Sequence, residues 1–318
     1  MIFDDIFLQI KNSNSVAIFT HVRADGDCLG SGLAMYYSIK KLGKTVDLYN
    51  AEVIPKNFNF LIKDIVKHTI SEKYDLYISV DSPNPKLLGS FGYLFEDGDN
   101  NTINIDHHIS NTKYAKINYV DSKASSACEV VYDLLTQTKQ KLDDNIAEAI
   151  LCGIATDTGC FKYSSTTGKT HQIASVLYDF NIDFNKMFYY LFRIQTKKQI
   201  LLTQKILNKV RYFCNDKVVI SGLNKKDILD VQATENDMPR MVDSLVGIEG
   251  VQVAITYKQD TDGGFKVSFR SRGLVDVNEL AQCFGGGGHV MASGCKIYQK
   301  EEQVVKLLVS KAGKFLVE

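Results

Sequence analysis

The sequence has no excess of charge of either sign. Lysine plus arginine and aspartate plus glutamate number 37 each. Strong general affinity for long nucleic acid usually comes with a basic surface, because neutralisation of phosphates drives that binding. The balance disfavours a protein that binds long duplexes. It fits more easily with a small anionic substrate.

The sequence also lacks paired cysteines and long hydrophobic runs. Its seven cysteines are odd in number and form no C-x-x-C pair, which disfavours a disulfide scaffold and a zinc ribbon. Most of them have apolar neighbours in the sequence, which is typical of small buried residues in a reducing compartment. No apolar run approaches the roughly 20 residues of a membrane span, and the N-terminus is acidic rather than basic. We therefore expect a cytoplasmic protein without a membrane partner.

The chain has 318 residues, 45% of them hydrophobic, which is enough for two domains. In its first half, short apolar runs alternate with segments of helical periodicity. The runs predict strands at 16–20, 45–49, 76–80 and 102–105, and the periodic segments predict helices at 29–42, 127–135 and 145–156. This alternation favours a parallel α/β sheet with helices on both faces.

The second half has a different pattern. Residues 183–209 show a long apolar and charged periodicity without glycine or proline, which predicts a connecting helix. Beyond it, strands are predicted at 217–221, 251–257, 265–271 and 294–298, with a hairpin turn at 262–264 and a C-terminal helix. We therefore predict a catalytic domain over 1–182, a helical linker over 183–210 and a smaller α+β domain over 211–318.

Potential metal ligands directly follow the first predicted strand. They are His21, Asp25 and Asp27. Ligands of open α/β sheets bind outside the carboxyl ends of the strands. In an extended loop, residues two apart point the same way, so Asp25 and Asp27 could converge on one ion. The alternative is a polar loop in which an aspartate caps the next helix.

Three further segments end in polar side chains. Asp81 follows the predicted strand at 76–80, and Asp157 follows an apolar helix. For Asp81, the alternative to a metal ligand is a simple turn aspartate. Asp106, His107 and His108 follow residues 102–105. In such a triplet one imidazole can bind a metal while a carboxylate fixes its other ring nitrogen, and the second histidine can face the substrate.

Taken together, these segments predict a metal centre. The candidate ligands are His21, Asp25, Asp27, Asp81, His107 and Asp157. Carboxylates with some imidazole suit Mn²⁺ or Mg²⁺, and the histidines favour Mn²⁺. Six ligands are too many for one such ion, whereas two ions about 3.5–4 Å apart and bridged by one carboxylate would use them all. The reaction implied is metal-assisted phosphoester hydrolysis.

A glycine-rich segment in the second domain predicts a substrate site, although a flexible linker is the alternative. Glycine allows backbone N–H groups to approach a phosphate or a base, and arginine suits bidentate phosphate binding. The candidate substrate-binding residues are Arg270, Arg272, Gly286, Gly287, Gly288, His289 and Ser293.

These motifs, in this order, resemble those of the DHH phosphoesterases. The N-terminal motifs match the family's four catalytic motifs, and residues 269–273 and 285–289 match its first type of associated C-terminal domain. The resemblance implies that His21 and Asp25 hold one Mn²⁺. It implies that Asp27, His107 and Asp157 hold another and that Asp81 bridges the two. By the same resemblance, Asp106 orients His107, while His108 contacts the scissile phosphate or protonates the leaving group.

The two-domain length resembles the nano-RNase branch of this family. The implied substrates are short single-stranded oligoribonucleotides and 3′-phosphoadenosine 5′-phosphate (pAp), gripped at their far end by the second domain. Hydrolysis of cyclic di-AMP or of pApA is the alternative enzyme reading. A manganese pyrophosphatase is disfavoured by the C-terminal motifs. A nucleotide-binding sensor would be expected to lack a metal ligand, and none is missing. The oligomeric state, a homodimer included, stays open.

Overall fold

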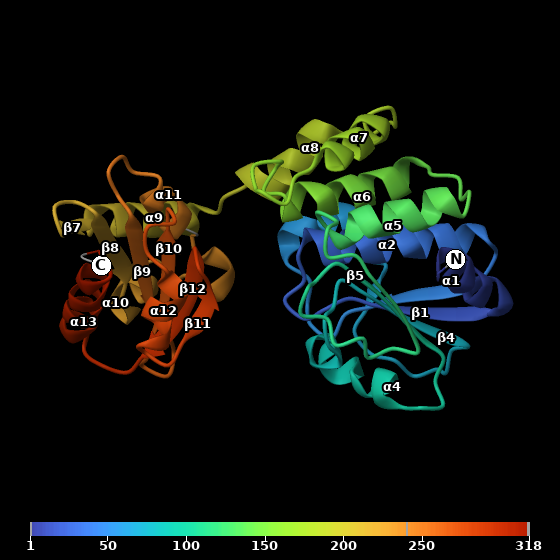
Figure 1. The fold of residues 1–318 in the computed structure, drawn as a ribbon, viewed down its shortest axis with the longest axis horizontal. Coiled ribbons are helices and arrows are strands. Elements are labelled where there is room, and N and C mark those ends of the chain that lie inside the picture. Colours follow the sequence, from blue (N-terminus) through green and yellow to red (C-terminus); the bar gives the residue numbers. More distant parts are fainter. Residues whose placement is uncertain (1, 240, 317–318) are drawn as a thin grey trace. The chain divides into compact units, whose positions relative to one another are not determined.

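The computed structural model describes residues 2–239 and 241–316. The chain forms two compact units, which meet in sequence between Ile194 and Gln195, and each has a sheet of its own (Figure 1). This boundary lies within the segment predicted as a linker. Among the described residues, no helix combines the length and the apolar character that crossing a bilayer requires.

The prediction of one continuous connecting helix is corrected. The segment consists of α8 (Phe184–Phe188), a π-helical turn (Tyr189–Arg193) and α9 (Lys197–Asn208). Ile194 is extended between them, with φ −63° and ψ 130°. Thr196 starts α9 through a capping box with Gln199, in which each side chain bonds the other residue's backbone N–H. The cap makes α9 a new helix rather than a continuation.

The first unit contains a six-stranded parallel sheet in the order β3-β2-β1-β4-β5-β6. Its strands are β1 (Ser15–Phe19), β2 (Thr45–Tyr49), β3 (Val66–Lys67), β4 (Leu76–Val80), β5 (Thr102–Asp106) and β6 (Ile117–Val120). The parallel sheet and its four predicted strands are confirmed, and β3 and β6 are additional.

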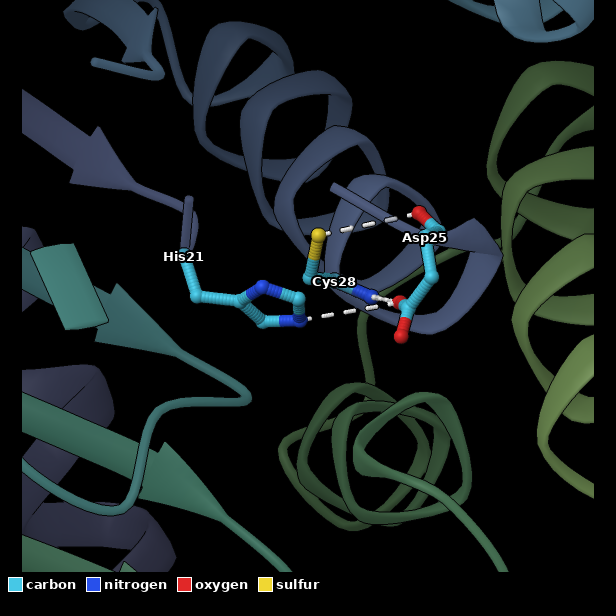
Figure 2. A group of neighbouring side chains, drawn as sticks. All are labelled: His21, Asp25 and Cys28. Carbon is cyan, nitrogen blue, oxygen red and sulfur yellow. Dashed lines mark hydrogen bonds and ion pairs between the residues drawn. The ribbon is translucent and has the colours of Figure 1, made fainter. Parts of the chain in front are cut away.

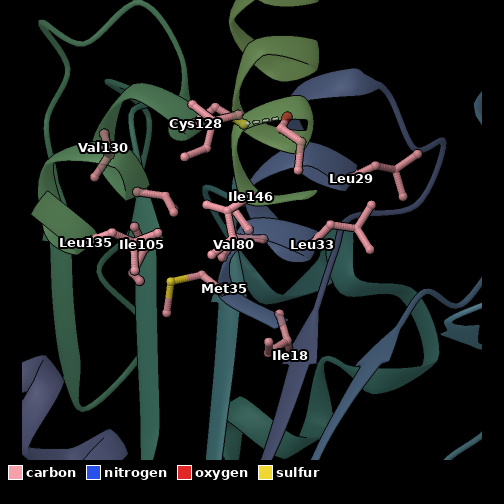
Figure 3. Packing of buried hydrophobic residues seen from close by; sticks show 14 of the residues in the cluster. Ile18, Leu29, Leu33, Met35, Val80, Ile105, Cys128, Val130, Leu135 and Ile146 are labelled. Carbon is pink, nitrogen blue, oxygen red and sulfur yellow. Dashed lines mark hydrogen bonds between the residues drawn. The ribbon is translucent and has the colours of Figure 1, made fainter. Parts of the chain in front are cut away.

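Helices cover both faces of this sheet (Figure 1). They are α1 (Ile2–Asn12), α2 (Gly26–Lys41), α3 (Asn59–Ile62), α4 (Tyr93–Glu96), α5 (Ala127–Gln137) and α6 (Asp144–Asp157), with 3₁₀ turns η1 (Lys56–Phe58) and η2 (Pro85–Phe91). Helix α7 (Gly168–Leu177) packs on α5 and α6. Successive side chains of β1 point alternately to the two faces of the sheet. Val16 and Ile18 pack into the core with α2, α5 and α6 (Figure 3), whereas Ala17 and Phe19 pack into an aromatic cluster with η2 and α4. Burial on both faces explains the continuous apolar runs.

Glycines allow α2 and α6 to lie unusually close to each other. A Cβ at Gly30 would lie 2.3 Å from the carbonyl oxygen of Ala149, and one at Gly26 would lie 2.5 Å from the side chain of Thr156. The two helices therefore run antiparallel in contact. The start of α2 consequently meets the end of α6, where Asp157 lies.

The second unit is a mixed sheet with helices, as predicted for a smaller α+β domain. The strand order is β11-β12-β10-β9-β8-β7. The strands are β7 (Arg211–Phe213), β8 (Val218–Leu223), β9 (Val253–Gln259), β10 (Phe265–Ser271), β11 (Gly287–His289) and β12 (Ala292–Ile297). Its helices are α10 (Lys225–Asp230), α11 (Val242–Val246), α12 (Val277–Gln282) and α13 (Glu301–Lys314), with a 3₁₀ turn η4 (Glu235–Asp237). The predicted hairpin is confirmed, since β9 and β10 are antiparallel neighbours.

Candidate metal centre

The candidate site lies where the strand order of the parallel sheet reverses. β1 has β2 on one side and β4 on the other, so the chain leaves the centre in both directions. Such a switch point opens a crevice outside the carboxyl ends of the strands. His21 follows β1, Asp81 follows β4 and Asp106 ends β5.

All six residues predicted as metal ligands come together there. Nε2 of His21 lies 3.5 Å from Oδ2 of Asp81 and 3.7 Å from Oδ1 of Asp25. Nε2 of His107 lies 3.5 Å from Oδ1 of Asp81. The same nitrogen lies 3.7 Å from Asp27 and 3.4 Å from Asp157. The two oxygens of Asp81 thus face two different histidines.

Asp81 combines burial with an unusual backbone conformation. It is 3% exposed, its backbone has a positive φ of 52°, and its Oδ1 has no hydrogen-bond partner among the described residues. Positive φ in a residue other than glycine stores strain, and strained residues cluster at functional sites. A buried carboxylate oxygen without a donor is costly. A cation is the partner that this donor set lacks, so the residues present fit a divalent metal.

The two imidazoles are oriented by backbone carbonyls. Nδ1 of His21 bonds the carbonyl oxygen of Val22 at 2.7 Å, and Nδ1 of His107 bonds that of Ala124 at 3.4 Å. A ring whose Nδ1 donates to a carbonyl leaves Nε2 as an acceptor or metal ligand. Both Nε2 atoms point toward the carboxylates.

Asp25 and Asp27 do not converge through an extended loop, so that argument from the sequence was wrong. Asp25 is the N-cap of α2, and its Oδ1 accepts the backbone N–H groups of Asp27 and Cys28 at 3.1 and 3.0 Å. Figure 2 shows its carboxylate beside His21 and Cys28. Asp27 is already helical and fully buried. The alternative reading of a helix cap was correct for Asp25, and the cap also faces His21.

The start of another helix holds Asp27. Its carboxylate accepts the backbone N–H groups of Ala127 at 2.6 Å and Cys128 at 2.9 Å, in the first turn of α5. Unpaired N–H groups and the positive end of the helix dipole make such a turn a good partner for an anion. Burial nevertheless raises the pKa of Asp27, and the nearby carboxylates of Asp81 and Asp157 add to this.

The pairing of the third motif also differs from expectation. Oδ1 of Asp106 bonds Nδ1 of His108 at 2.8 Å, so Asp106 orients His108 rather than His107. Nδ1 of His108 also lies 3.6 Å from Oδ1 of Asp81, so both histidines lie beside that oxygen and only His108 bonds Asp106. The hydrogen bond to Asp106 raises the pKa of His108.

Three asparagines support the site and were missed by the sequence reasoning. Nδ2 of Asn111 donates to Asp106 at 2.5 Å and to Oδ1 of the buried Asn104 at 2.7 Å. Asn50, just after β2, donates to the carbonyl oxygen of His21 at 2.7 Å. The sequence did contain a signal for two of them, because Asn104 is a polar residue within an apolar strand and Asn50 directly follows a strand.

The cluster is strongly anionic. Burial, together with the charges of Asp81 and Asp25, raises the pKa of Asp157 to about 6, although His107 opposes the shift. Burial alone would lower the pKa of His107, but its carboxylate neighbours, Asp81 foremost, raise it to about 10. Asp157 thus resists ionisation, and His107 retains its proton. Both shifts indicate that the carboxylates of this site are not balanced by enough positive charge. Hard carboxylate oxygens and imidazole nitrogens suit Mn²⁺ or Mg²⁺.

The residues predicted in the second unit form a less open site than expected. Gly287 and Gly288 lie in the edge strand β11, not in a loop. The N–H of Gly286 bonds the carbonyl oxygen of Ala281, and that of Gly288 bonds Oδ1 of Asn278. Those two N–H groups are therefore not free for a phosphate, which corrects that part of the prediction.

The side chains near this strand divide into engaged and exposed groups. Nε of Arg270 bonds Asp243 at 2.7 Å, and the buried hydroxyl of Ser293 donates to the carbonyl oxygen of Val277 at 2.5 Å. Arg272 and His289 are exposed. The exposed pair is better placed to meet a ligand.

Comparison with known proteins agrees with this organisation. The model of the DHH family N-terminal domain matches residues 15–154, and that of the DHHA1 domain matches residues 215–318. A Streptococcus mutans protein named probable bifunctional oligoribonuclease and PAP phosphatase NrnA is 32% identical, over 94% of this chain and 95% of its own. The Bacillus subtilis bifunctional oligoribonuclease and PAP phosphatase NrnA is 28% identical over 94% of each chain.

Solved structures share the fold. An exopolyphosphatase-related protein from Bacteroides fragilis superposes with a TM-score of 0.89 at 24% identity, covering 100% of this chain and 98% of its own. RecJ from Thermus thermophilus in complex with Mn²⁺ gives a TM-score of 0.56 at 13% identity, covering 99% of this chain and 54% of its own. With both domain matches and a full-length relative at 32% identity, the chain belongs to the DHH family of phosphoesterases.

Proposed function

We propose that this phosphoesterase uses two divalent metal ions, preferentially Mn²⁺, to hydrolyse short oligoribonucleotides and pAp. One observation carries the two-metal part. The carboxylate of Asp81 is buried, its oxygens face His21 and His107 separately, and its Oδ1 has no hydrogen-bond partner among the described residues. A bridging role would satisfy that oxygen and use all six ligands.

The ligands divide into two groups around this bridge. His21 and Asp25 would hold one ion with Asp81. Asp27, His107 and Asp157 would hold the other with Asp81. Ions bound there would supply Lewis-acid polarisation of a phosphoryl group and a nucleophile derived from water at neutral pH.

His108 is the proposed acid of the reaction. Its Nδ1 is bonded to Asp106, its Nε2 has no hydrogen bond among the described residues, and its side chain is 41% exposed. A histidine held by a buried carboxylate is oriented and favours its protonated form. In this proposal Nε2 contacts the scissile phosphate and donates a proton to the leaving oxygen.

The substrate part of the proposal has separate support. Relatives that match nearly the whole chain are named as oligoribonucleases and PAP phosphatases. The chain also lacks the net positive charge typical of proteins that bind long nucleic acid. In the second unit we assign the substrate contacts mainly to Arg272 and His289. We also propose a cytoplasmic location. All seven cysteines are free thiols, which is typical of proteins in a reducing compartment.

A panel of substrates tests the proposal. The panel contains pApA, oligoribonucleotides of increasing length, pAp, cyclic di-AMP and inorganic pyrophosphate, each with Mn²⁺ and with EDTA. We expect metal-dependent turnover of pApA and pAp that falls as RNA length increases. Preference for cyclic di-AMP would replace the substrate assignment, and nucleotide binding without turnover would indicate a sensor.

Substitution in the second unit tests the substrate contacts. Arg272→Ala should raise KM for pApA about tenfold, because a charge-assisted hydrogen bond is lost. The kcat and the Mn²⁺ affinity should change little. An unchanged KM in both Arg272→Ala and His289→Ala would remove these residues from the proposed site.

A further inference from the structure

One short segment orients two of the proposed metal ligands. The carbonyl oxygen of Ala124 accepts from His107, and the backbone N–H groups of Ala127 and Cys128 donate to Asp27. Residues 124–128 thus bind the imidazole of His107 and the carboxylate of Asp27 through backbone atoms, and the thiol of Cys128 also donates to the carbonyl oxygen of Asp27. Their effect on the site depends on how firmly this backbone is held.

A buried glutamate outside the site holds that backbone. Glu129 is 2% exposed and lies in the first turn of α5. Its Oε2 accepts from the hydroxyl of Ser125 at 2.7 Å, from the backbone N–H of Ser125 at 3.4 Å and from the hydroxyl of Thr170 at 3.0 Å. A buried carboxylate is costly unless it is well bonded, and three donors meet this one oxygen.

The other carboxylate oxygen of Glu129 pairs with a partly exposed lysine. Its Oε1 lies 3.3 Å from Nζ of Lys169, which also bonds Asp133 at 2.5 Å. Lys169 is 45% exposed, so solvent screens this pair and it contributes little. The bonds to Ser125 and Thr170 are the ones that tie the segment to α7.

We propose that Glu129 is a positioning residue of the metal centre. By anchoring Ser125 it holds residues 124–128 in the conformation that orients His107 and Asp27. This inference rests on the proposed metal centre, and none of the six proposed ligands contacts Glu129 in the bonds described above. Groups that orient metal ligands typically change metal affinity by about 10–100-fold when removed.

The variants separate the anchoring bonds from the ion pair. Glu129→Ala removes both. Glu129→Gln retains an oxygen that can accept from Ser125 and Thr170 while losing the charge. Asp133→Asn, one turn further along α5, is the matched control, because it removes a carboxylate that bonds the same lysine but not Ser125 or Thr170. Ser125→Ala removes only the hydroxyl and is a milder change should Glu129→Ala fail to fold.

The measurement is Mn²⁺ affinity, followed by electron paramagnetic resonance of free Mn²⁺, with urea unfolding of each metal-free protein alongside. We expect Glu129→Ala to weaken Mn²⁺ binding at least about tenfold, with Glu129→Gln and Asp133→Asn within about threefold of wild type. Ser125→Ala should weaken binding by several-fold.

Two results would overturn the inference. In the first, Glu129→Ala loses stability but binds Mn²⁺ like the wild-type protein, which would make the role of Glu129 merely structural. If Glu129→Ala does not fold, the same result in Ser125→Ala has the same meaning. An equal loss in Asp133→Asn would assign the effect to the lysine pair. Failure of the wild-type protein to bind Mn²⁺ would be a different result, because it would remove the proposed function itself.

Discussion

Asp106 binds His108 and not the adjacent His107. The Nδ1 of His108 lies 2.8 Å from Oδ1 of Asp106, while the ring of His107 bonds the carbonyl oxygen of Ala124. This pairing separates two tasks between neighbouring histidines. His107 faces the carboxylate cluster, and Nε2 of His108, which has no hydrogen bond within the described part of the chain, is the atom that we propose contacts the substrate.

Asp106→Asn should therefore affect turnover and not metal binding. Asn111 donates to Oδ2 of Asp106, so an amide there would turn its oxygen toward Asn111 and its NH₂ toward His108. With an NH₂ group donating to its Nδ1, His108 would be held in the neutral form and would be a poor acid, so kcat should fall by about 10²-fold or more. Steady-state kinetics with pApA and Mn²⁺ titration provide the measurement. Weaker Mn²⁺ binding at unchanged kcat would show that Asp106 acts on His107 instead.

Asp81→Asn should remove activity while leaving the metal-free protein folded. Asparagine tolerates the positive φ of 52°, so the backbone is preserved. The variant loses the carboxylate that the two proposed ions would share, so Mn²⁺-dependent turnover should fall below detection, while cooperative urea unfolding in EDTA should be retained. Urea unfolding and activity assays check both effects, with the exposed Asp99→Asn as control. Retained Mn²⁺-dependent activity would contradict the bridging role.

The metal-free protein should lose stability as pH rises. Folding raises the pKa of Asp157 to about 6 and that of His107 to about 10, and it raises the pKa of Asp27 as well. A raised pKa contributes stability that is complete below the unfolded-state pKa and is lost as pH rises through the folded-state value. In EDTA the free energy of unfolding should thus fall by at least about 1 kcal/mol between pH 6 and pH 9.

Saturating Mn²⁺ should reverse this trend, because metal binding needs deprotonated ligands. Urea titrations at both pH values, with and without Mn²⁺, provide the comparison. A constant or rising stability in EDTA would be at odds with a crowded, uncompensated carboxylate cluster.

Gly153→Ala should disturb the centre through packing alone. A Cβ there would lie 2.2 Å from Sγ of Cys128 and 2.7 Å from Oδ1 of Asp27. Relief of this overlap must move α6 or the carboxylate, at a cost of about 1–3 kcal/mol, and should weaken Mn²⁺ binding. Gly168→Ala is the matched control, because its added Cβ would have no neighbour within 4 Å in the part of the chain that the structure describes. Equal stability of the two variants in thermal unfolding would contradict the packing account.

Much of the site could be predicted because a parallel sheet brings the carboxyl ends of its strands to one edge. His21, Asp81 and the triplet beginning at Asp106 follow directly from that rule. Their partners could not be predicted, because they depend on tertiary contacts. The backbone N–H groups that hold Asp27 come from residues 127 and 128, about a hundred positions later in the chain.

The missed parts of the fold have local causes. β3 has only two residues, too few for a periodic pattern, and residues 117–120 of β6 include polar side chains. The break before α9 was overlooked although its signal was present. Thr196 followed three residues later by Gln199 is a capping box, which begins a helix and therefore argues against one helix running through.

The most direct test of the central claim is anomalous diffraction from crystals of this protein grown with Mn²⁺. The account predicts two Mn²⁺ peaks, one beside each carboxylate oxygen of Asp81, with His21 at one and His107 at the other. A single peak, or peaks that do not involve Asp81, would contradict the two-metal centre.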